Sequence, residues 1–288
     1  MTDEHTSAGT RLAVIGAGTM GHGIAQVAAV AGYDVRLHDV SEEVLKAALE
    51  RVRANLDRGV ELGKVERGAR DAALHRLTVT TDLAAAVGGA EIVVEAVPEI
   101  LELKREILSG ITPHVEPTTL LGTNTSSLSI TSIAEAVEAP ERVVGMHFFN
   151  PVHIMELVEI VRGDRTAPDT VELARAVVER MGKTPIVVAD SPGFASSRLG
   201  IILGLEAIRM VESGVATAED IDRAMELGYR HPMGPLRLTD LVGLDVRLEI
   251  ARYLRRELGE RFQPPELLER MVEEGHLGKK AGRGFYAW

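Results

Sequence analysis

The sequence contains no cysteine among its 288 residues. Disulfide bonds and thiolate chemistry are therefore excluded, and a metal site would have to be built from histidines and carboxylates alone. We expect no metal site and a protein of the reducing cytoplasm. The first residues, MTDEHTSAGT, are acidic and polar, so they lack the basic-then-apolar order of a secretion signal.

Long hydrophobic runs and an excess of positive charge are also absent. The most apolar run, residues 199–208, contains Glu206 and is far shorter than the roughly 20 residues that span a bilayer. We therefore expect no membrane association. The formal net charge of −11 repels polyanions, so the composition also argues against nucleic acid as a partner.

The first two thirds of the chain alternate short apolar runs with helical spacing, which is typical of a mainly parallel sheet covered by helices. The expected strands are residues 12–15, 35–38, 78–80, 92–97, 120–122, 143–147, 156–161 and 186–188. Helical spacing is clearest in residues 42–62 and 170–182. We predict an α/β fold with an N-terminal Rossmann-type domain over residues 1–190.

Strand-like runs disappear after residue 190, and the rest of the chain has helical character. The expected helices are a long one from Ser191 to Gly214, then residues 217–227, 238–258 and 265–275. We predict a second, smaller all-helical domain over residues 191–288. Its first helix is apolar on more than one face and contains Gly200 and Gly204, so we expect it to pack against a second copy in a homodimer.

A glycine motif follows the first expected strand and precedes a helical run. Its letters, GAGTMG, carry Gly16, Gly18 and Gly21. The first glycine permits a tight turn, the second lets the main chain approach a pyrophosphate, and the third lets the helix lie close to the strand. The order strand, glycine turn, helix predicts a dinucleotide site.

Asp39 ends the second expected strand and is the acidic residue that this motif requires. A carboxylate there accepts hydrogen bonds from the adenosine ribose hydroxyls and repels a 2′-phosphate, so NAD is favoured over NADP. The alternative is that Asp39 only caps the helix that starts near Ser41.

His147 ends another apolar run, at the sheet edge where open α/β sheets bind ligands. Glu159 lies twelve residues further on, in the next strand-like segment. A carboxylate opposite an imidazole fixes its tautomer and favours the imidazolium, so the two residues are candidates for a general base and its orienting partner. The spacing alone fits a structural histidine equally well.

Short polar side chains follow a third apolar strand in the segment GTNTSS, residues 122–127. Such residues commonly form turns or helix caps. At the carboxyl edge of the same sheet they are equally suited to polarise a substrate oxygen. Separately, residues 46–76 carry eight basic and five acidic side chains, either as a solvated helical face or as a site for a small anion.

Several segments together resemble the 3-hydroxyacyl-CoA dehydrogenase family, from about residue 11 to Trp288. The segments are GAGTMGHGIA, NTSSLSIT, GMHFFNPVHIMELVEIV, DSPGF, GYRHPMGPLRLTDLVGLD and GKKAGRGFYAW. The resemblance implies an NAD-binding domain followed by a helical dimerisation domain. It implies oxidation of a short L-3-hydroxyacyl-CoA, such as 3-hydroxybutyryl-CoA, to the 3-ketoacyl-CoA, and the reverse reaction.

The same resemblance assigns roles to individual residues. His147 would be the general base, Glu159 its partner, and Ser126 the group that holds the substrate 3-oxygen. The cofactor-binding set would be Gly16, Gly18, Thr19, Met20, Gly21, Asp39, Glu99, Lys104 and Asn124. The substrate-binding set would be Ser126, Asn150, Ser197, Lys64 and Arg58, the last two on the phosphates of CoA.

Ser197 departs from the family pattern, which has an asparagine directly before the arginine in this segment. Serine has a shorter reach and lacks the paired donor and acceptor of an amide. Two alternatives stay open at this point: a related dehydrogenase of a free hydroxy acid, of the gulonate type, and a noncatalytic NAD-binding structural protein.

Overall fold

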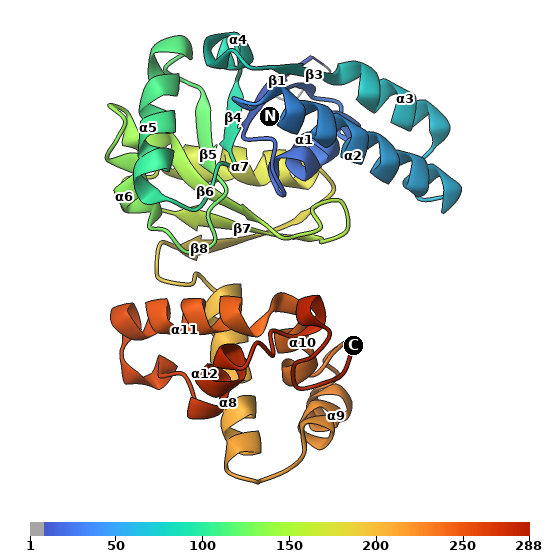
Figure 1. Ribbon diagram of the computed structural model, residues 1–288. Coiled ribbons are helices and arrows are strands. Elements are labelled where there is room, and N and C mark those ends of the chain that lie inside the picture. The colour runs from blue at the N-terminus through green and yellow to red at the C-terminus, as the bar shows by residue number, and fades with distance from the viewer. Residues whose placement is uncertain (1–8) are drawn as a thin grey trace. The chain divides into compact units, whose positions relative to one another are not determined.

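The computed structural model describes residues 9–288, which form two compact units that divide between Ser191 and Pro192 (Figure 1). The eight strands, all in unit 1, are β1 (Arg11–Ile15), β2 (Asp34–His38), β3 (Leu77–Thr80), β4 (Ile92–Glu95), β5 (Leu120–Thr123), β6 (Val143–Phe148), β7 (Leu157–Arg162) and β8 (Thr184–Ala189). They form one sheet in the order β3-β2-β1-β4-β5-β6-β7-β8.

All neighbouring strands are parallel except β6 and β7, which are antiparallel. The strand order reverses between β1 and β4, the point at which open α/β sheets form a ligand crevice. The mostly parallel α/β architecture with a helical second part is confirmed, and each of the eight expected strands is present. The strand expected over residues 92–97 ends at Glu95, because the backbone leaves the sheet there to line a cavity.

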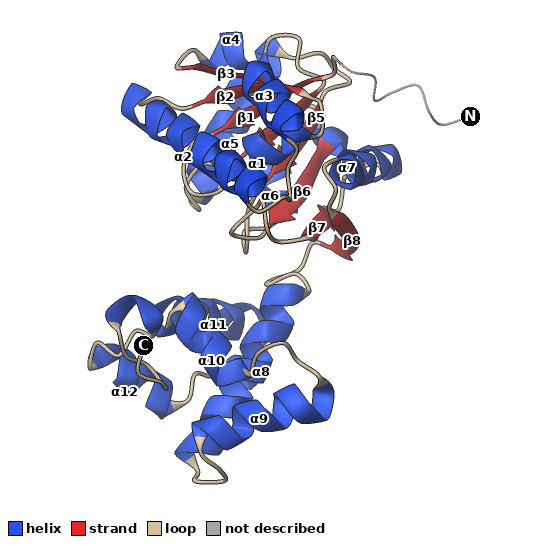
Figure 2. Cartoon of the chain, turned by 90° about the vertical axis from the view of Figure 1, so that its right-hand side faces the viewer, coloured by secondary structure: helices blue, strands red, loops and turns tan. Residues whose placement is uncertain are grey.

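Helices lie on both faces of the sheet (Figure 2). They are α1 (Gly21–Val30), α2 (Glu42–Glu61), α3 (Arg67–Arg76), α4 (Leu83–Val87), α5 (Leu101–Ile111), α6 (Ile130–Ala134) and α7 (Pro168–Arg180). Apolar side chains from α1, α2 and α7 pack with β1 and β2 in one buried cluster. Central strands such as β4, with the run Ile-Val-Val, are buried along their length, which explains why they lack polar alternation.

The regular elements of unit 2 are helices, and two isolated β-bridges join residues near its C-terminal end. It consists of α8 (Ser196–Glu212), α9 (Ala218–Tyr229), α10 (Pro235–Val242), α11 (Leu244–Leu258) and α12 (Glu266–Glu273). Thr217 caps α9 by accepting from the Asp220 backbone N–H at 3.2 Å, as the sequence predicts. The single helix expected over residues 238–258 is wrong, because Gly243 adopts a φ of +105° and separates α10 from α11. The helix expected from Ser191 begins at Ser196.

No helix among residues 9–288 combines the length and the apolar character that a bilayer crossing requires.

Asp240 in α10 fastens the C-terminal segment to unit 2. Its side chain is fully buried, and its two oxygens accept from the backbone N–H groups of Phe285 and Tyr286, both at 2.9 Å, and from the indole Nε1 of Trp288 at 2.8 Å. Tyr286 also donates its hydroxyl to the buried Asp222 at 2.7 Å. Asp240 therefore obtains these hydrogen bonds from residues 285–288, whereas Asp222 accepts from Tyr286 and also from the backbone N–H groups of Leu236 and Arg237.

Replacing Asp240 by Ala is expected to lower the free energy of unfolding by about 2–4 kcal/mol, because three donors lose a fully buried charged acceptor. Urea denaturation followed by circular dichroism measures the effect. Glu249→Gln, an exposed acid on α11, is the matched control and is expected to stay within about 0.5 kcal/mol of the native protein. An Asp240→Ala variant as stable as this control would contradict the prediction.

Candidate functional site

The glycine loop joins the end of β1 to the start of α1. Gly16 has a φ of +98°, and a Cβ there would lie 2.7 Å from the carbonyl oxygen of Ala96. A Cβ at Gly21 would overlap the carbonyl oxygen of Gly16, so only glycine lets α1 begin against the strand. At Gly18 a Cβ would meet nothing within 4 Å, which leaves the backbone open to a ligand. Each glycine thus has the physical reason that the motif predicts.

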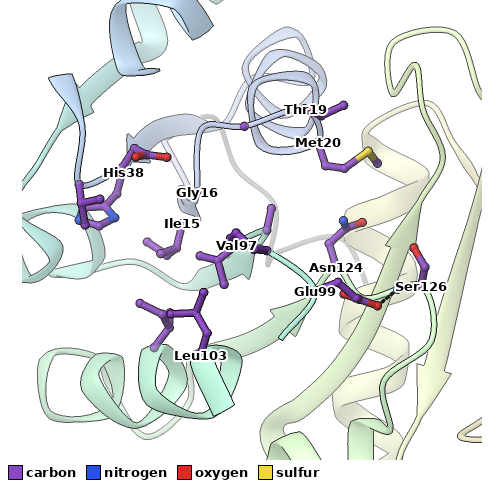
Figure 3. A pocket seen from close by; sticks show the side chains of 16 residues that line it. Ile15, Gly16, Thr19, Met20, His38, Val97, Glu99, Leu103, Asn124 and Ser126 are labelled. Carbon is purple, nitrogen blue, oxygen red and sulfur yellow. Dashed lines mark hydrogen bonds between the residues drawn. The ribbon is translucent and has the colours of Figure 1, made fainter. Parts of the chain in front are cut away.

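A cavity of about 700 Å³ opens beside this loop at the carboxyl ends of β1, β2, β4 and β5. It brings together most of the residues that the sequence assigned to the cofactor and substrate: Gly16, Gly18, Thr19, Met20, Asp39, Glu99, Asn124 and Ser126. In Figure 3, Gly16, Thr19 and Met20 border one side, while Glu99, Asn124 and Ser126 lie together at one end. Sequence reasoning missed the apolar wall of Val97, Leu103 and Ile107, because α5 carried no motif.

Asp39 both lines the cavity and holds the glycine loop. Its Oδ2 accepts from the backbone N–H of Ala17 at 2.9 Å, and its Oδ1 accepts from that of Ser41 at 3.2 Å. The helix cap of α2 is Ser41 itself, whose hydroxyl accepts from the Val44 N–H at 3.3 Å. The side chain that caps α2 is therefore that of Ser41, and Asp39 lines the cavity.

His38 precedes Asp39 and forms part of the same cavity wall. Its ring is buried, and burial lowers the pKa of the imidazole below its ordinary value. A neutral ring there leaves Asp39 as the charged group at this end of the cavity.

His147 and Glu159 face each other across the antiparallel pair β6 and β7, in direct register. His147 Nδ1 lies 2.8 Å from Glu159 Oε2, and the side chains are 6% and 0% exposed. A buried carboxylate at this distance holds Nδ1 in its protonated form and leaves Nε2 as the nitrogen that can exchange a proton.

Asn124 links the two parts of the site. Its Oδ1 accepts from the backbone N–H of Phe148 at 2.9 Å, so the end of β5 is tied to the residue after His147. Asn124 also lines the cavity, two residues before Ser126. This hydrogen bond therefore fixes the position of β6, which carries His147, relative to the residues after β5 that line the cavity.

Glu99 organises the serine segment that follows β5. Its Oε1 accepts from the Ser126 N–H at 2.8 Å (Figure 3). It also accepts from the Thr125 hydroxyl at 2.6 Å and from the Ser127 N–H at 3.1 Å. The segment is thus a turn held by an acid, and it also presents an exposed Ser126 to the cavity. The two interpretations left open by the sequence, a turn and a polar group beside the cavity, are therefore compatible.

Lys104 does not line the cavity, because its ammonium group is fully buried against Glu95. The Nζ atom lies 2.9 Å and 3.2 Å from the two carboxylate oxygens of Glu95 and 3.5 Å from Glu99. Burial raises the pKa of the Glu95 carboxyl, while the Lys104 ammonium and the donors Thr123 and Val97 oppose that rise. Sequence reasoning missed Glu95, although an acid inside the apolar run IVVEAV signals a buried partner.

Lys64, Arg58 and Asn150 are not among the residues that line the cavity, and Ser197 belongs to unit 2. Lys64 and Arg58 are exposed near the end of α2, and Arg58 pairs with Glu61 at 2.8 Å. Asn150 is exposed after β6, and Ser197 lies in the first turn of α8, in unit 2. Among residues 9–288, no cluster of three or more His, Asp or Glu side chains is arranged to hold a metal ion.

Comparison with known proteins assigns the chain to a family. The NAD binding domain of 3-hydroxyacyl-CoA dehydrogenase matches residues 11–191, and the C-terminal domain of 3-hydroxyacyl-CoA dehydrogenase matches residues 193–288. The chain therefore belongs to the 3-hydroxyacyl-CoA dehydrogenase family, and the predicted resemblance is confirmed.

Similar proteins match over almost their whole length. The chain is 45% identical to a probable 3-hydroxybutyryl-CoA dehydrogenase of Bacillus subtilis, with 96% of each protein covered. It is 45% identical to 3-hydroxybutyryl-CoA dehydrogenase of Mycobacterium tuberculosis, covering 96% of this chain and 98% of that protein. The solved (S)-3-hydroxybutyryl-CoA dehydrogenase of Ralstonia eutropha is 38% identical with a TM-score of 0.93, covering 97% and 99%.

Replacing Asp39 by Asn is expected to weaken NAD binding about tenfold and to reduce the preference for NAD over NADP, because a charged acceptor becomes neutral. The amide oxygen still accepts from Ala17, so the loop remains in place. Titration calorimetry with each dinucleotide measures both constants. Asp164→Asn, at an exposed loop position, is the control, and unchanged selectivity in Asp39→Asn would refute the assignment.

Proposed function

We propose that this enzyme oxidises the 3-hydroxyl of a short-chain L-3-hydroxyacyl-CoA with NAD and catalyses the reverse reduction, with 3-hydroxybutyryl-CoA and acetoacetyl-CoA as the substrate pair. The observation that carries the proposal is the buried His147–Glu159 pair, whose strand is bonded to a residue of the dinucleotide cavity. The names of the similar proteins support the same substrate class.

The residues around the cavity fit NAD. The open backbone at Gly18, with the N-terminus of α1 behind it, suits the pyrophosphate, and Asp39 suits the ribose hydroxyls. Thr19 and Met20 border the middle of the cavity, and Glu99 and Asn124 lie at the end that we assign to the nicotinamide. When bound, NAD accepts the hydride that leaves C3 of the substrate.

His147 acts as the general base in this proposal. Oxidation of a carbinol requires that its proton leave as the oxygen becomes a carbonyl, and Nε2 of a neutral imidazole accepts that proton. Glu159, bonded at Nδ1, stabilises the imidazolium that forms. Ser126 donates a hydrogen bond to the substrate 3-oxygen. In the reverse direction the imidazolium returns the proton to that oxygen.

The remaining substrate contacts are also proposals. Asn150 and Ser197 would contact the acyl part, with Ser197 replacing the amide that the family pattern contains. The cationic groups of Lys64 and Arg58 would meet the phosphates of CoA, supported by the basic excess in residues 46–76. We further propose that unit 1 serves the cofactor, that unit 2 serves substrate and dimerisation, and that the enzyme works in the cytoplasm.

Replacing His147 by Gln is expected to lower turnover about 10²–10⁴-fold with acetoacetyl-CoA and NADH, while NADH binding persists. The side chain keeps its volume but loses the transferable proton. Stopped-flow absorbance of NADH measures turnover, and NADH fluorescence measures binding. His114→Gln, in a short exposed turn after α5, is the control. Native-like turnover in His147→Gln would sink the assignment.

The substrate is tested by comparing acetoacetyl-CoA, longer 3-ketoacyl-CoAs, a dicarboxylic analogue and gulonate. We expect the highest kcat/KM with acetoacetyl-CoA. Activity on gulonate alone would favour the free hydroxy-acid alternative. NAD binding without any acyl-CoA turnover would favour the structural protein instead.

A homodimer through unit 2 is supported by apolar side chains exposed on three helices. Leu199 of α8 is 66% exposed, and Leu238, Val242 and Val246 of α10 and α11 are 37–42% exposed. We expect a dimeric mass in sedimentation equilibrium at micromolar concentration. Val242→Glu is expected to shift the equilibrium from dimer toward monomer, because it places a charge in the proposed dimer contact. Glu249→Gln is the control. A monomeric native protein would remove this proposal.

A further inference from the structure

Three charged side chains form a chain of contacts behind the nicotinamide end of the cavity. Glu95 and Lys104 are fully buried and paired at 2.9 Å, and Lys104 lies 3.5 Å from Glu99, which lines the cavity. We call these three residues the charge triad. Glu95 is absent from the predicted site and is not among the residues that line the cavity.

The direct partners of Glu95 are those of a carboxylate, although burial raises the pKa of the group. Its Oε1 accepts from the Val97 N–H at 2.6 Å and from Lys104, and its Oε2 accepts from the Thr123 hydroxyl at 2.6 Å and from Lys104 at 3.2 Å. An ammonium group and a backbone N–H have no lone pair to receive a carboxyl proton. Both oxygens are therefore provided with donors, as a carboxylate requires.

Lys104 is surrounded by oxygen atoms and is the cation of the triad. Besides Glu95 and Glu99, its Nζ donates to the carbonyl oxygens of Val97 at 3.3 Å and Asn124 at 3.4 Å. Two carboxylates and one ammonium give the triad a net charge of −1. Glu95 neutralises Lys104, so the negative charge of Glu99 remains uncompensated at the cavity surface, where that side chain is 38% exposed.

We infer that the charge triad sets the relative affinity of the site for oxidised and reduced NAD, and that Glu95 is the positioning and charge-balancing residue in it. The inference rests on the proposed placement of the nicotinamide beside Glu99. The oxidised nicotinamide ring carries a positive charge and the reduced ring carries none, so a net charge of −1 stabilises the oxidised form selectively.

This preference has a consequence for the reaction. A site that binds the oxidised form more tightly makes the bound reduced form a stronger reductant, since binding and redox equilibria are linked. The triad therefore favours reduction of the 3-ketone in the bound complex.

The experiment compares a single variant with a double variant. Glu95→Gln removes one negative charge, and Lys104 keeps Glu99 as its partner, so the net charge of the triad becomes zero. The double variant Glu95→Gln/Lys104→Met removes one charge of each sign. The net charge of the triad therefore returns to −1, although the buried ion pair is lost. The dissociation constants of NAD and NADH are measured by titration calorimetry and NADH fluorescence.

A unit charge about 12 Å away, at an effective dielectric constant of about 20, changes a binding constant roughly tenfold. We therefore expect the ratio Kd(NAD)/Kd(NADH) to rise about tenfold in Glu95→Gln and to return to the native value in the double variant. A purely structural role for Glu95 would perturb the double variant at least as much as the single one. Circular dichroism and unfolding midpoints verify that both variants fold.

An unchanged ratio in Glu95→Gln, or an equal shift in both variants, overturns the inference while the cofactor assignment stands. If Glu95→Gln fails to fold, the double variant is compared with the native protein. Both carry a net charge of −1 in the triad, so their Kd(NAD)/Kd(NADH) ratios must agree, and different ratios overturn the inference. Failure of the native protein to bind either form of NAD removes the proposed function together with the inference.

Discussion

The candidate site depends on the register between β6 and β7. These strands are antiparallel and place His147 directly opposite Glu159, with both side chains on one face of the sheet. A shift of one residue would turn the carboxylate to the other face and break the hydrogen bond between the two side chains. The next strand, β8, is parallel to β7 and in register with it, which holds β7 from its other side.

Polar groups at the carboxyl edge of the sheet are connected by hydrogen bonds that cross between strands. Asn124 after β5 bonds to the backbone of Phe148 in β6, and Thr123 in β5 bonds to Glu95 in β4. Each of these bonds joins neighbouring parallel strands at the level where the strands end. The sheet thus supplies rigid positions for the imidazole and the buried acid, whereas Asp39, Glu99, Asn124 and Ser126 lie in the loops that follow the strands.

Local sequence patterns predicted the elements of the fold but not their pairing. The eight strands were evident because buried parallel strands are continuous apolar runs, and the dinucleotide loop because only glycine meets its steric demands at Gly16 and Gly21. The break at Gly243 was missed, because glycine is tolerated within a helix and its φ of +105° depends on the packing around it. The antiparallel direction of β7 follows from a short connection with no helix.

The candidate site was predictable to a similar extent. Motif residues such as Asp39 and Asn124 do line one cavity, whereas the resemblance alone pointed to Lys104 and gave no sign that it is buried. The triad with Glu95 depends on contacts between β4, β5 and α5, which no single window of sequence contains.

The closeness of His147 and Glu159 along the chain bears on how the protein assembles. They are twelve positions apart, whereas β1 reaches its partner β4 by pairing Leu12 with Ile92. The entropy lost on closing a loop grows with its length, so the hairpin that carries the imidazole and its acid needs far less chain ordering than the dinucleotide crevice. In a folding chain, the His147–Glu159 pair can therefore form as a local unit before the crevice is closed.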